Sequence, residues 1–419
     1  MLVLHVSDTH LGAMPYGLIS RAKDIYEAFK ETIDIALRER VSIYLHAGDF
    51  FDSPNPLPES YVIAYRELRK LKEAGIRVVI IAGQHDTPRR HSVSPLYLLQ
   101  DLGVVDMLAI NSITSGVFRD SSLNVLIYAV PHGLKSSIHS IAVSREGQNR
   151  SVLVAHLLLK EIGIPSEEAD VSLSQIPRGF TYIALGDYHM KTEFRHVDGA
   201  PAVYPGATEI HKENECCDKY VAFVDLSAEK PAVSFIKLKS VRPWIRIKCV
   251  DVSTCMRELS SIRRVEGVKK PIVSIDLQKI RVETIAKILS EMVSSGVIEY
   301  YRIKVAEDSD ALESSIPRLS DAYEYLDLGR IVRNMVRHEG LAQLLLRYVK
   351  EPSKQVAEDI VQYLKNNTDA VKALETNSTH NAFQYGDSEG GSTNSSGVVN
   401  RKTSTVGRAL QSKPSGGGK

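Results

Sequence analysis

Cysteine, long apolar runs and an excess of one charge are scarce or missing in this sequence. Only four of the 419 residues are cysteine and none forms a CxxC pair, which argues against a zinc ribbon and favours a cytoplasmic protein with reduced thiols. No segment approaches the ~18 consecutive apolar residues of a membrane span, so we expect no membrane partner. The formal net charge of +1 provides no global basic field, so a polyanion would have to bind a local patch.

Residues 1–225 alternate strand-like apolar runs with amphipathic helical stretches. The helical stretches span about 21–39 and 59–74 and separate the first three strands. This alternation predicts a layered α/β fold. After Asp187 the pattern changes to short strands (AVYPG, KYVAFVDL and AVSFIKL), which predict antiparallel strands that complete a second sheet. The buried strands predicted before that point are 2–7, 42–48, 77–83, 124–130, 151–156 and 182–186.

The rest of the chain divides into three further segments. Residues 240–305 follow a strand–helix–strand–helix–strand pattern of small-domain size, without a motif that carries chemistry. Residues 325–365 repeat apolar side chains at helical spacing. Beyond about residue 366 the chain is rich in Ser, Asn, Thr and Gly, so we expect it to bury no core and to be disordered.

Polar residues follow the apolar strands at the points where the strands end. In open α/β sheets, binding sites form at the carboxyl ends of strands, so residues far apart in the sequence are expected to meet in one crevice. The clusters are Asp8-Thr9-His10, Gly48-Asp49, Gly83-Gln84-His85-Asp86, His156 and Gly186-Asp187-Tyr188-His189.

The residue types in these clusters indicate a site for two divalent metal ions. Carboxylate, imidazole and amide ligands suit manganese, iron or zinc. Each residue also has a simpler interpretation: Asp8 or Asp49 as a turn cap, and His156 as a core histidine, which is how we interpret His46. The joint pattern favours the metal site, because seven candidates exceed what one tetrahedral ion binds and suit two ions that share a carboxylate. The seven are Asp8, His10, Asp49, Gln84, His156, Asp187 and His189.

The order of these motifs resembles the calcineurin-like metallophosphoesterase superfamily. DTH, GDFFD, GQHD, the strand-terminal His156 and GDYH carry the resemblance. The segments GDFFDSPNP, DLGVVD, YIALGDYH and YPGATE are similar to its Mre-eleven nuclease branch, called SbcD in bacteria, in an archaeal form. The resemblance is strong over about residues 1–225. It implies a two-sheet α/β sandwich flanked by helices.

The resemblance also implies a domain plan and partners. We expect a nuclease domain at 1–238, a small DNA-capping domain at 239–310, a helical segment at 325–365 that binds a Rad-fifty type ATPase, and a disordered tail at 366–419. For 325–365 the alternative is a helical bundle packed on its own chain. The implied activity is a manganese-dependent DNA nuclease that processes double-strand breaks, as a double-strand exonuclease and a single-strand endonuclease. A homodimer is implied as well.

The family pattern assigns roles to the seven candidates, with Asp49 bridging the two ions. His85 stands next to the candidate ligand Gln84, so we expect it to protonate the leaving oxygen or to stabilise its charge. For Asp86 two interpretations stay open, orienting His85 or capping the next turn. The resemblance assigns Asp8, His10, Asp49 and His189 to one ion, and Asp49, Gln84, His156 and Asp187 to the other.

Two residues depart from the family pattern. Gln84 stands where Asn is usual, and Asp187 stands where His is usual. Both side chains can still bind a metal ion. The departures keep two alternatives open: a non-catalytic DNA-end-binding or scaffolding protein with an altered metal site, and a phosphodiesterase that acts on small nucleotides.

Overall fold

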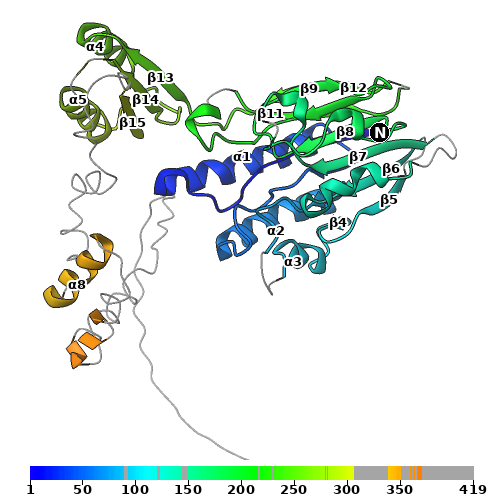
Figure 1. Cartoon of the computed structure of the whole chain (residues 1–419), viewed down its shortest axis with the longest axis horizontal. Coiled ribbons are helices and arrows are strands. Elements are labelled where there is room, and N and C mark those ends of the chain that lie inside the picture. Colours follow the sequence, from blue (N-terminus) through cyan, green and yellow to red (C-terminus); the bar gives the residue numbers. More distant parts are fainter. Residues whose placement is uncertain are drawn as a thin grey trace, which may run out of the picture. The chain divides into compact units, whose positions relative to one another are not determined.

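The computed structural model of the 419-residue chain separates into two compact units, Met1–Glu307 and Asp308–Lys419 (Figure 1). Residues 370–419 of the tail expected to be disordered, 366–419, and much of the helical segment 325–365 lie outside the described residues, whereas Asn366, Thr368 and Asp369 of that tail are helical. The structure describes 1–88, 93–119, 123–143, 149–165, 167–215, 218–228, 230–278, 280, 282–305, 338–350, 359–360, 362–363 and 366–369.

The first sheet has six strands in the order β12-β11-β1-β2-β3-β4. Strands β1 to β4 run parallel, and β11 joins the amino-terminal strand β1 in antiparallel register, with Leu2 opposite Asp225. The strands are β1 Leu2–Val6, β2 Ile43–His46, β3 Arg77–Ile81, β4 Met107–Ala109, β11 Tyr220–Asp225 and β12 Ala232–Lys237.

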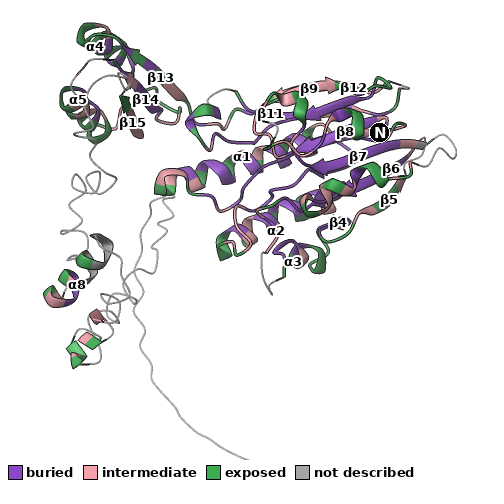
Figure 2. Ribbon diagram, viewed as in Figure 1, coloured by how far each residue is buried: buried purple, intermediate pink, exposed green. Residues whose placement is uncertain are grey.

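Three helices cover one face of this sheet: α1 (Ile19–Arg38), α2 (Pro58–Glu73) and α3 (Leu96–Asp101). Each of these helices carries buried residues (Figure 2). Phe29 of α1, for example, belongs to the same core cluster as Tyr44 of β2. The remaining strand residues pack against the second sheet. Strands buried on both faces explain the continuous apolar runs in the sequence.

The second sheet has the order β5-β6-β7-β8-β10-β9. Its central strands β6, β7 and β8 are parallel, so their carboxyl ends share one edge. The expectation that the late strands complete this sheet is wrong for β11 and β12, because backbone pairing with β1 places them in the first sheet. The strands are β5 Thr114–Arg119, β6 Asn124–Val130, β7 Asn149–His156, β8 Tyr182–Gly186, β9 Thr192–Arg195 and β10 Pro201–Tyr204.

A three-stranded parallel sheet with two helices follows, in the element order that the sequence predicts. It has its own apolar core, which includes Ile275 and Leu289. Its elements are β13 Trp244–Cys249, α4 Val252–Ser261, β14 Ile272–Leu277, α5 Val282–Ser294 and β15 Tyr300–Val305. Short 3-10 helices connect elements of the first two sheets at η1 Pro15–Gly17, η2 His132–Ser140, η3 Lys160–Ile162, η4 Leu173–Gln175 and η5 Glu213–Glu215.

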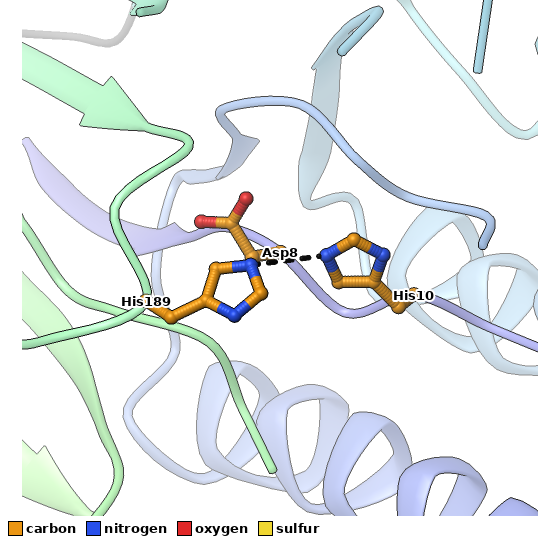
Figure 3. Close-up of side chains that lie close together, drawn as sticks. All are labelled: Asp8, His10 and His189. Atoms are coloured by element: carbon orange, nitrogen blue, oxygen red, sulfur yellow. Dashed lines mark hydrogen bonds between the residues drawn. The ribbon is translucent and has the colours of Figure 1, made fainter. Parts of the chain in front are cut away.

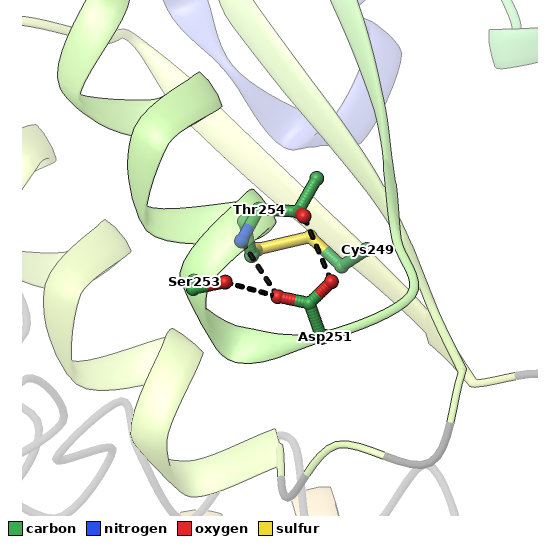
Figure 4. The surroundings of a disulfide bond; sticks show 5 residues. Cys249, Asp251, Ser253 and Thr254 are labelled. Carbon is green, nitrogen blue, oxygen red and sulfur yellow. Dashed lines mark hydrogen bonds between the residues drawn. A yellow bond between two sulfur atoms is a disulfide. The ribbon is translucent and has the colours of Figure 1, made fainter.

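The expectation of reduced thiols is wrong for Cys249 and Cys255, which form a disulfide (Figure 4). Asp251 caps α4 by accepting hydrogen bonds from the Thr254 backbone N–H at 2.8 Å and from the hydroxyls of Ser253 and Thr254. This cap turns the chain sharply after β13, which brings the two Cα atoms to 4.9 Å. The sequence did not reveal this turn, because a spacing of six residues fixes no geometry.

The second unit contains α8 (Glu339–Lys350), which lies within the predicted helical segment. Leu341 and Ala342 in its first turns are buried. Across the residues that the structure describes, no helix is long and apolar enough to cross a membrane.

Candidate metal centre

The loops after β1, β2, β3, β7 and β8 bring all of the sequence-predicted site residues together. The backbone N–H of Asp187 lies 3.2 Å from both carboxylate oxygens of Asp8, although 179 residues separate them. The backbone N–H of His85 donates to Oδ1 of Asp49 at 2.9 Å. The two sheets therefore meet at one crevice, where the carboxyl ends of both sets of parallel strands converge.

Glycines at the strand ends allow this close approach. A Cβ atom at Gly83 would lie 2.0 Å from Oδ1 of Asp49, and one at Gly48 would lie 2.2 Å from Nδ1 of His156. Gly48 also has a φ of +93°, which side chains rarely adopt. The glycines before Asp49 and Gln84 in the motifs thus make room for neighbouring site residues.

Backbone strain is concentrated at this crevice. Positive φ is uncommon for residues with a side chain, and it costs on the order of 1–3 kcal/mol at each position. Among the described residues six non-glycine positions have positive φ, and four of them are site candidates. These four are Asp8 (53°), His10 (44°), Asp49 (52°) and Asp187 (91°).

Asp8, His10 and His189 form the first group of ligand atoms (Figure 3). One ligand atom of each lies within 4.8 Å of the others, and the Nε2 atoms of the two histidines are 3.2 Å apart. Neighbouring ligands of an octahedral ion with bonds of about 2.1 Å lie about 3 Å apart. The two imidazoles therefore have the spacing of two ligands of one ion.

Gln84, His156 and Asp187 form the second group. Oε1 of Gln84 lies 2.8 Å from Nε2 of His156, and Nε2 of Gln84 donates to Oδ1 of Asp187 at 2.9 Å. The amide oxygen and the imidazole have the spacing expected for neighbouring ligands of one ion. The amide nitrogen meanwhile holds the Asp187 carboxylate beside them.

Oδ2 of Asp49 lies between the two groups. This oxygen is buried and has no hydrogen-bond partner among the described residues. It is 3.5 Å from Nε2 of His156, 3.7 Å from Nε2 of His10 and 3.9 Å from Nε2 of His85. A buried carboxylate oxygen without a partner is costly, and a shared cation would satisfy it.

Hydrogen bonds orient the histidines so that Nε2 faces the crevice. Nδ1 of His156 lies 2.7 Å from the backbone oxygen of Ala47, and Nδ1 of His189 lies 2.8 Å from Oε1 of Glu215. Nδ1 of His10 faces a carboxylate oxygen of Asp52 at 3.3 Å but forms no hydrogen bond with it. An acceptor on Nδ1 fixes the tautomer that leaves Nε2 free for a metal ion.

His85 is held in the same way but is more exposed. Its Nδ1 lies 2.7 Å from the backbone oxygen of Asp52, and 42% of its side chain is exposed. It borders an open cleft of about 660 Å³ that is also lined by Gln84, Pro54 and Pro88. His85 thus contacts the space that a ligand would enter.

The charges in the crevice suit a cation. Burial would lower the pKa of His10, but the nearby carboxylate of Asp52 and the charges of Asp49 and Asp8 raise it to about 9. Burial would raise the pKa of Asp49, but the attraction of His156 and His10 holds it well below its usual range. His10 therefore holds a proton beside the ionised Asp49, and a metal ion that binds there would displace this proton.

Asp86 has a role that neither sequence interpretation foresaw. It is buried, and its carboxylate accepts hydrogen bonds from the backbone N–H groups of Phe50, Phe51 and Gly83. It therefore ties the loop after β2 to the loop after β3, rather than orienting the His85 ring or capping the next turn. His46 is buried and bonded to Thr9 at 3.0 Å, as a core histidine would be.

Sequence reasoning missed Asp52, His132 and Glu215. Asp52 stands three residues after Asp49 in GDFFD, and His132 follows the predicted strand 124–130 by two residues, so both had a signal. Glu215 lies in η5, far from any strand end, and nothing in its sequence surroundings marks it.

These donors fit divalent metal ions on chemical grounds. Carboxylate and imidazole groups converge in four overlapping clusters, and Oδ2 of Asp49 lies within 3.9 Å of a histidine from each of them. The clusters are Asp8–His10–His189, His10–Asp52–His85, His132–His156–Asp187 and Asp8–Asp49–His156.

Comparison with known families agrees with this site. The calcineurin-like phosphoesterase family profile matches residues 1–204, which contain all of the sequence-predicted site residues. The two-sheet α/β fold and the crevice of Asp and His side chains thus define a metallophosphoesterase.

Curated relatives narrow the assignment. The DNA double-strand break repair protein Mre11 of Saccharolobus solfataricus is 29% identical over 86% of this chain and 98% of its own length. Mre11 of Sulfolobus acidocaldarius is 30% identical over 72% of this chain and 82% of its own length. The chain belongs to the archaeal Mre11 family. A match to the solved structure of a dimetal phosphatase from Danio rerio covers 57% of this chain and 98% of that structure's chain. The two share 12% sequence identity with a TM-score of 0.39, which is too distant a similarity to support a role.

Proposed function

We propose that this protein is a two-metal phosphodiesterase that cuts DNA during double-strand-break repair. The observation that carries the proposal is the buried Oδ2 of Asp49, which lies between two groups of ligand atoms without a hydrogen-bond partner among the described residues. A carboxylate shared by two ions is the arrangement of two-metal hydrolases. The relatives named as DNA double-strand break repair proteins supply the substrate class.

Each ion has its own set of ligands in this proposal. The 3.2 Å contact between His10 and His189 supports the first set, and the 2.8 Å contact between His156 and Gln84 supports the second. The first set is Asp8, His10, Asp49 and His189, and the second is Asp49, Gln84, His156 and Asp187.

The bound ions, Asp49 and His85 have different roles in phosphodiester cleavage in this proposal. Bound ions supply charge neutralisation and a water of lowered pKa. Asp49 holds the two ligand sets in register. His85, fixed by the Asp52 backbone oxygen and open to the cleft, donates a proton or a hydrogen bond to the leaving oxygen.

We propose DNA as the substrate, and a basic surface on residues 244–305 supports this. Arg263, Arg264 and Lys270 line a cavity of about 300 Å³ in that unit, beside apolar side chains. Basic side chains of this kind contact backbone phosphates without reading sequence. We propose that residues 239–310 cap the DNA, and that the nuclease acts on double-strand ends and on single strands.

We also propose two protein partners. Leu57, Val62 and Leu98 leave apolar surface exposed on and beside α2 and α3, where a second copy of the chain would bind. Residues 325–365, which include α8, would bind a Rad-fifty type ATPase through an apolar helical face. Removing residues 325–419 should abolish that binding in a pull-down without unfolding residues 1–305, and unfolding seen by circular dichroism would contradict it.

The cleavage assay uses purified protein with supercoiled plasmid and end-labelled duplex DNA. Manganese should support nicking, and a chelator should stop it. The His85→Gln variant should keep its bound metal while turnover falls about a hundredfold to ten-thousandfold. No nicking by the wild type with manganese, magnesium or zinc would overturn the proposal.

A second candidate is a DNA-end-binding or scaffolding protein without turnover. The two departures from the family pattern favour it, because Gln84 and Asp187 bind each other through a hydrogen bond at the second ligand set. This protein would bind DNA ends and the ATPase but would not nick DNA. Cleavage of small phosphodiesters in place of DNA would instead indicate a small-nucleotide phosphodiesterase.

A further inference from the structure

His132 lies at the same sheet edge as two residues of the second ligand set. Strands β6, β7 and β8 are parallel neighbours, and a polar residue ends each strand or follows within two residues of its end. His156 ends β7 and Asp187 follows β8, while His132 follows β6 after one proline. Ligand atoms of His132, His156 and Asp187 all lie within 4.8 Å of one another.

One nitrogen of the His132 ring has nothing to bind among the described residues. Nδ1 is buried and has no hydrogen-bond partner there. Nε2 lies 3.3 Å from Nζ of Lys135, which also forms an ion pair with Asp170 at 2.7 Å. Because Asp170 anchors Lys135 independently, the His132 ring can change its bonding while Lys135 stays paired.

The second ligand set is short of nitrogen donors. Without His132, the second set has a single nitrogen donor, His156, beside oxygen donors from Asp49, Gln84 and Asp187. Oδ1 of Asp187 already accepts a hydrogen bond from the Gln84 amide. An additional nitrogen donor would complete the coordination of an ion that takes both nitrogen and oxygen ligands.

We propose that His132 is a further ligand of the second metal ion and makes that site suitable for borderline ions such as manganese, iron or zinc. This inference rests on the proposed two-metal function and adds a fifth protein ligand to the second set.

The test measures metal binding directly. Wild type, His132→Ala and His132→Asp are titrated with manganese and with zinc by calorimetry, and the spin coupling of two manganese ions is followed by electron paramagnetic resonance. His132→Ala should keep the first ion, lose the coupled signal and bind the second ion at least tenfold more weakly. His132→Asp should recover manganese binding but less zinc binding, because a carboxylate replaces the imidazole.

His139→Ala is the matched control, because His139 lies on the same 3-10 helix η2 and is exposed. It should bind both ions as the wild type does. Thermal unfolding of the metal-free proteins should be similar for all variants, and His132→Asp keeps the test valid if His132→Ala folds poorly.

Two outcomes separate this inference from the proposed function. If the wild type binds two coupled ions and His132→Ala binds them with unchanged affinity, the inference is overturned and the two-metal function stands. The same holds if only the KM for DNA changes, because His132 would then contact substrate. A wild type that binds fewer than two ions would overturn both.

Discussion

His189 and Glu215 are joined by a 2.8 Å hydrogen bond between Nδ1 and a buried carboxylate oxygen. Burial would raise the pKa of Glu215, but the bond and the charge of His189 lower it to about 2. The backbone N–H of His211 donates to the other carboxylate oxygen at 3.0 Å. Glu215 is therefore an ionised, fixed acceptor that turns Nε2 of His189 toward Asp8 and His10.

Replacing Glu215 should weaken the first metal site. Glu215→Gln should lower the affinity for the first ion about 10–100-fold, because an amide holds the imidazole less firmly than a carboxylate. Manganese titration measures this. Glu213→Gln on the same turn is the control, since its carboxylate lies 2.9 Å from Nζ of Lys304 instead. Equal affinities in the two variants would contradict the role of Glu215.

Asp24 on α1 links the helix to residues after the first sheet. It receives Nη1 of Arg21 at 2.6 Å, Nε of Arg242 at 2.6 Å and Nζ of Lys269 at 2.8 Å. Asp24→Ala would remove the carboxylate that the buried guanidinium groups of Arg21 and Arg242 share, so the free energy of unfolding should fall by about 3–5 kcal/mol.

Guanidinium denaturation tests this prediction, with Glu27→Ala as the control. Glu27 also pairs with Lys269, but half of its side chain is exposed, so its loss should cost no more than about 1 kcal/mol. Similar losses in the two variants would mean that burial does not set the strength of this network.

The buried His5 should lower the free energy of unfolding in acid. It is fully buried and 2.9 Å from the hydroxyl of Tyr182, and burial lowers its pKa from 6.5 to about 3. Below pH 6.5 the unfolded chain binds a proton that the folded chain does not, so stability falls as the pH drops from 6.5 toward 3. The full effect of this one group is on the order of 5 kcal/mol.

His5→Asn tests the pH dependence, because its amide can replace Nδ1 as the partner of Tyr182 without titrating. Unfolding free energies measured from pH 7 to pH 4 should decline less steeply in the variant than in the wild type. Parallel curves would show that His5 does not carry this dependence.

The two departures from the family pattern should set the metal preference of the second site. Compared with an Asn/His pair, Gln84 and Asp187 add one negative charge and oxygen donors there, which shifts the preference of the site toward harder ions. The double variant Gln84→Asn with Asp187→His should support less magnesium-dependent nicking relative to manganese and should bind zinc more tightly, with the first site unchanged. Unchanged preference and stoichiometry would mean that these side chains do not bind the second ion.

Much of this arrangement could be predicted because the local patterns are strong. The apolar runs of β1, β2 and β3 are buried on both faces, and polar residues such as Asp8 and Asp49 follow them directly. Parallel strands force those residues to one edge, so the convergence follows from strand order alone.

Other features depend on contacts that sequence patterns do not encode. Whether β11 extends the first or the second sheet is decided by pairing with β1 across more than 200 residues. Glu215 reaches His189 through the loop that follows β10, and Asp86 binds backbone groups of another loop. His132 could have been found, because it follows a predicted strand as His156 does.

The most direct test of the two-metal account is a manganese titration of Asp49→Ala beside the wild type. Asp49 lies 3.5 Å from Nε2 of His156 and 3.7 Å from Nε2 of His10, so its removal should disturb both sites at once. The wild type should bind two manganese ions and nick DNA, and Asp49→Ala should lose metal binding and all nicking. An Asp49→Ala protein that still binds two ions would contradict the account.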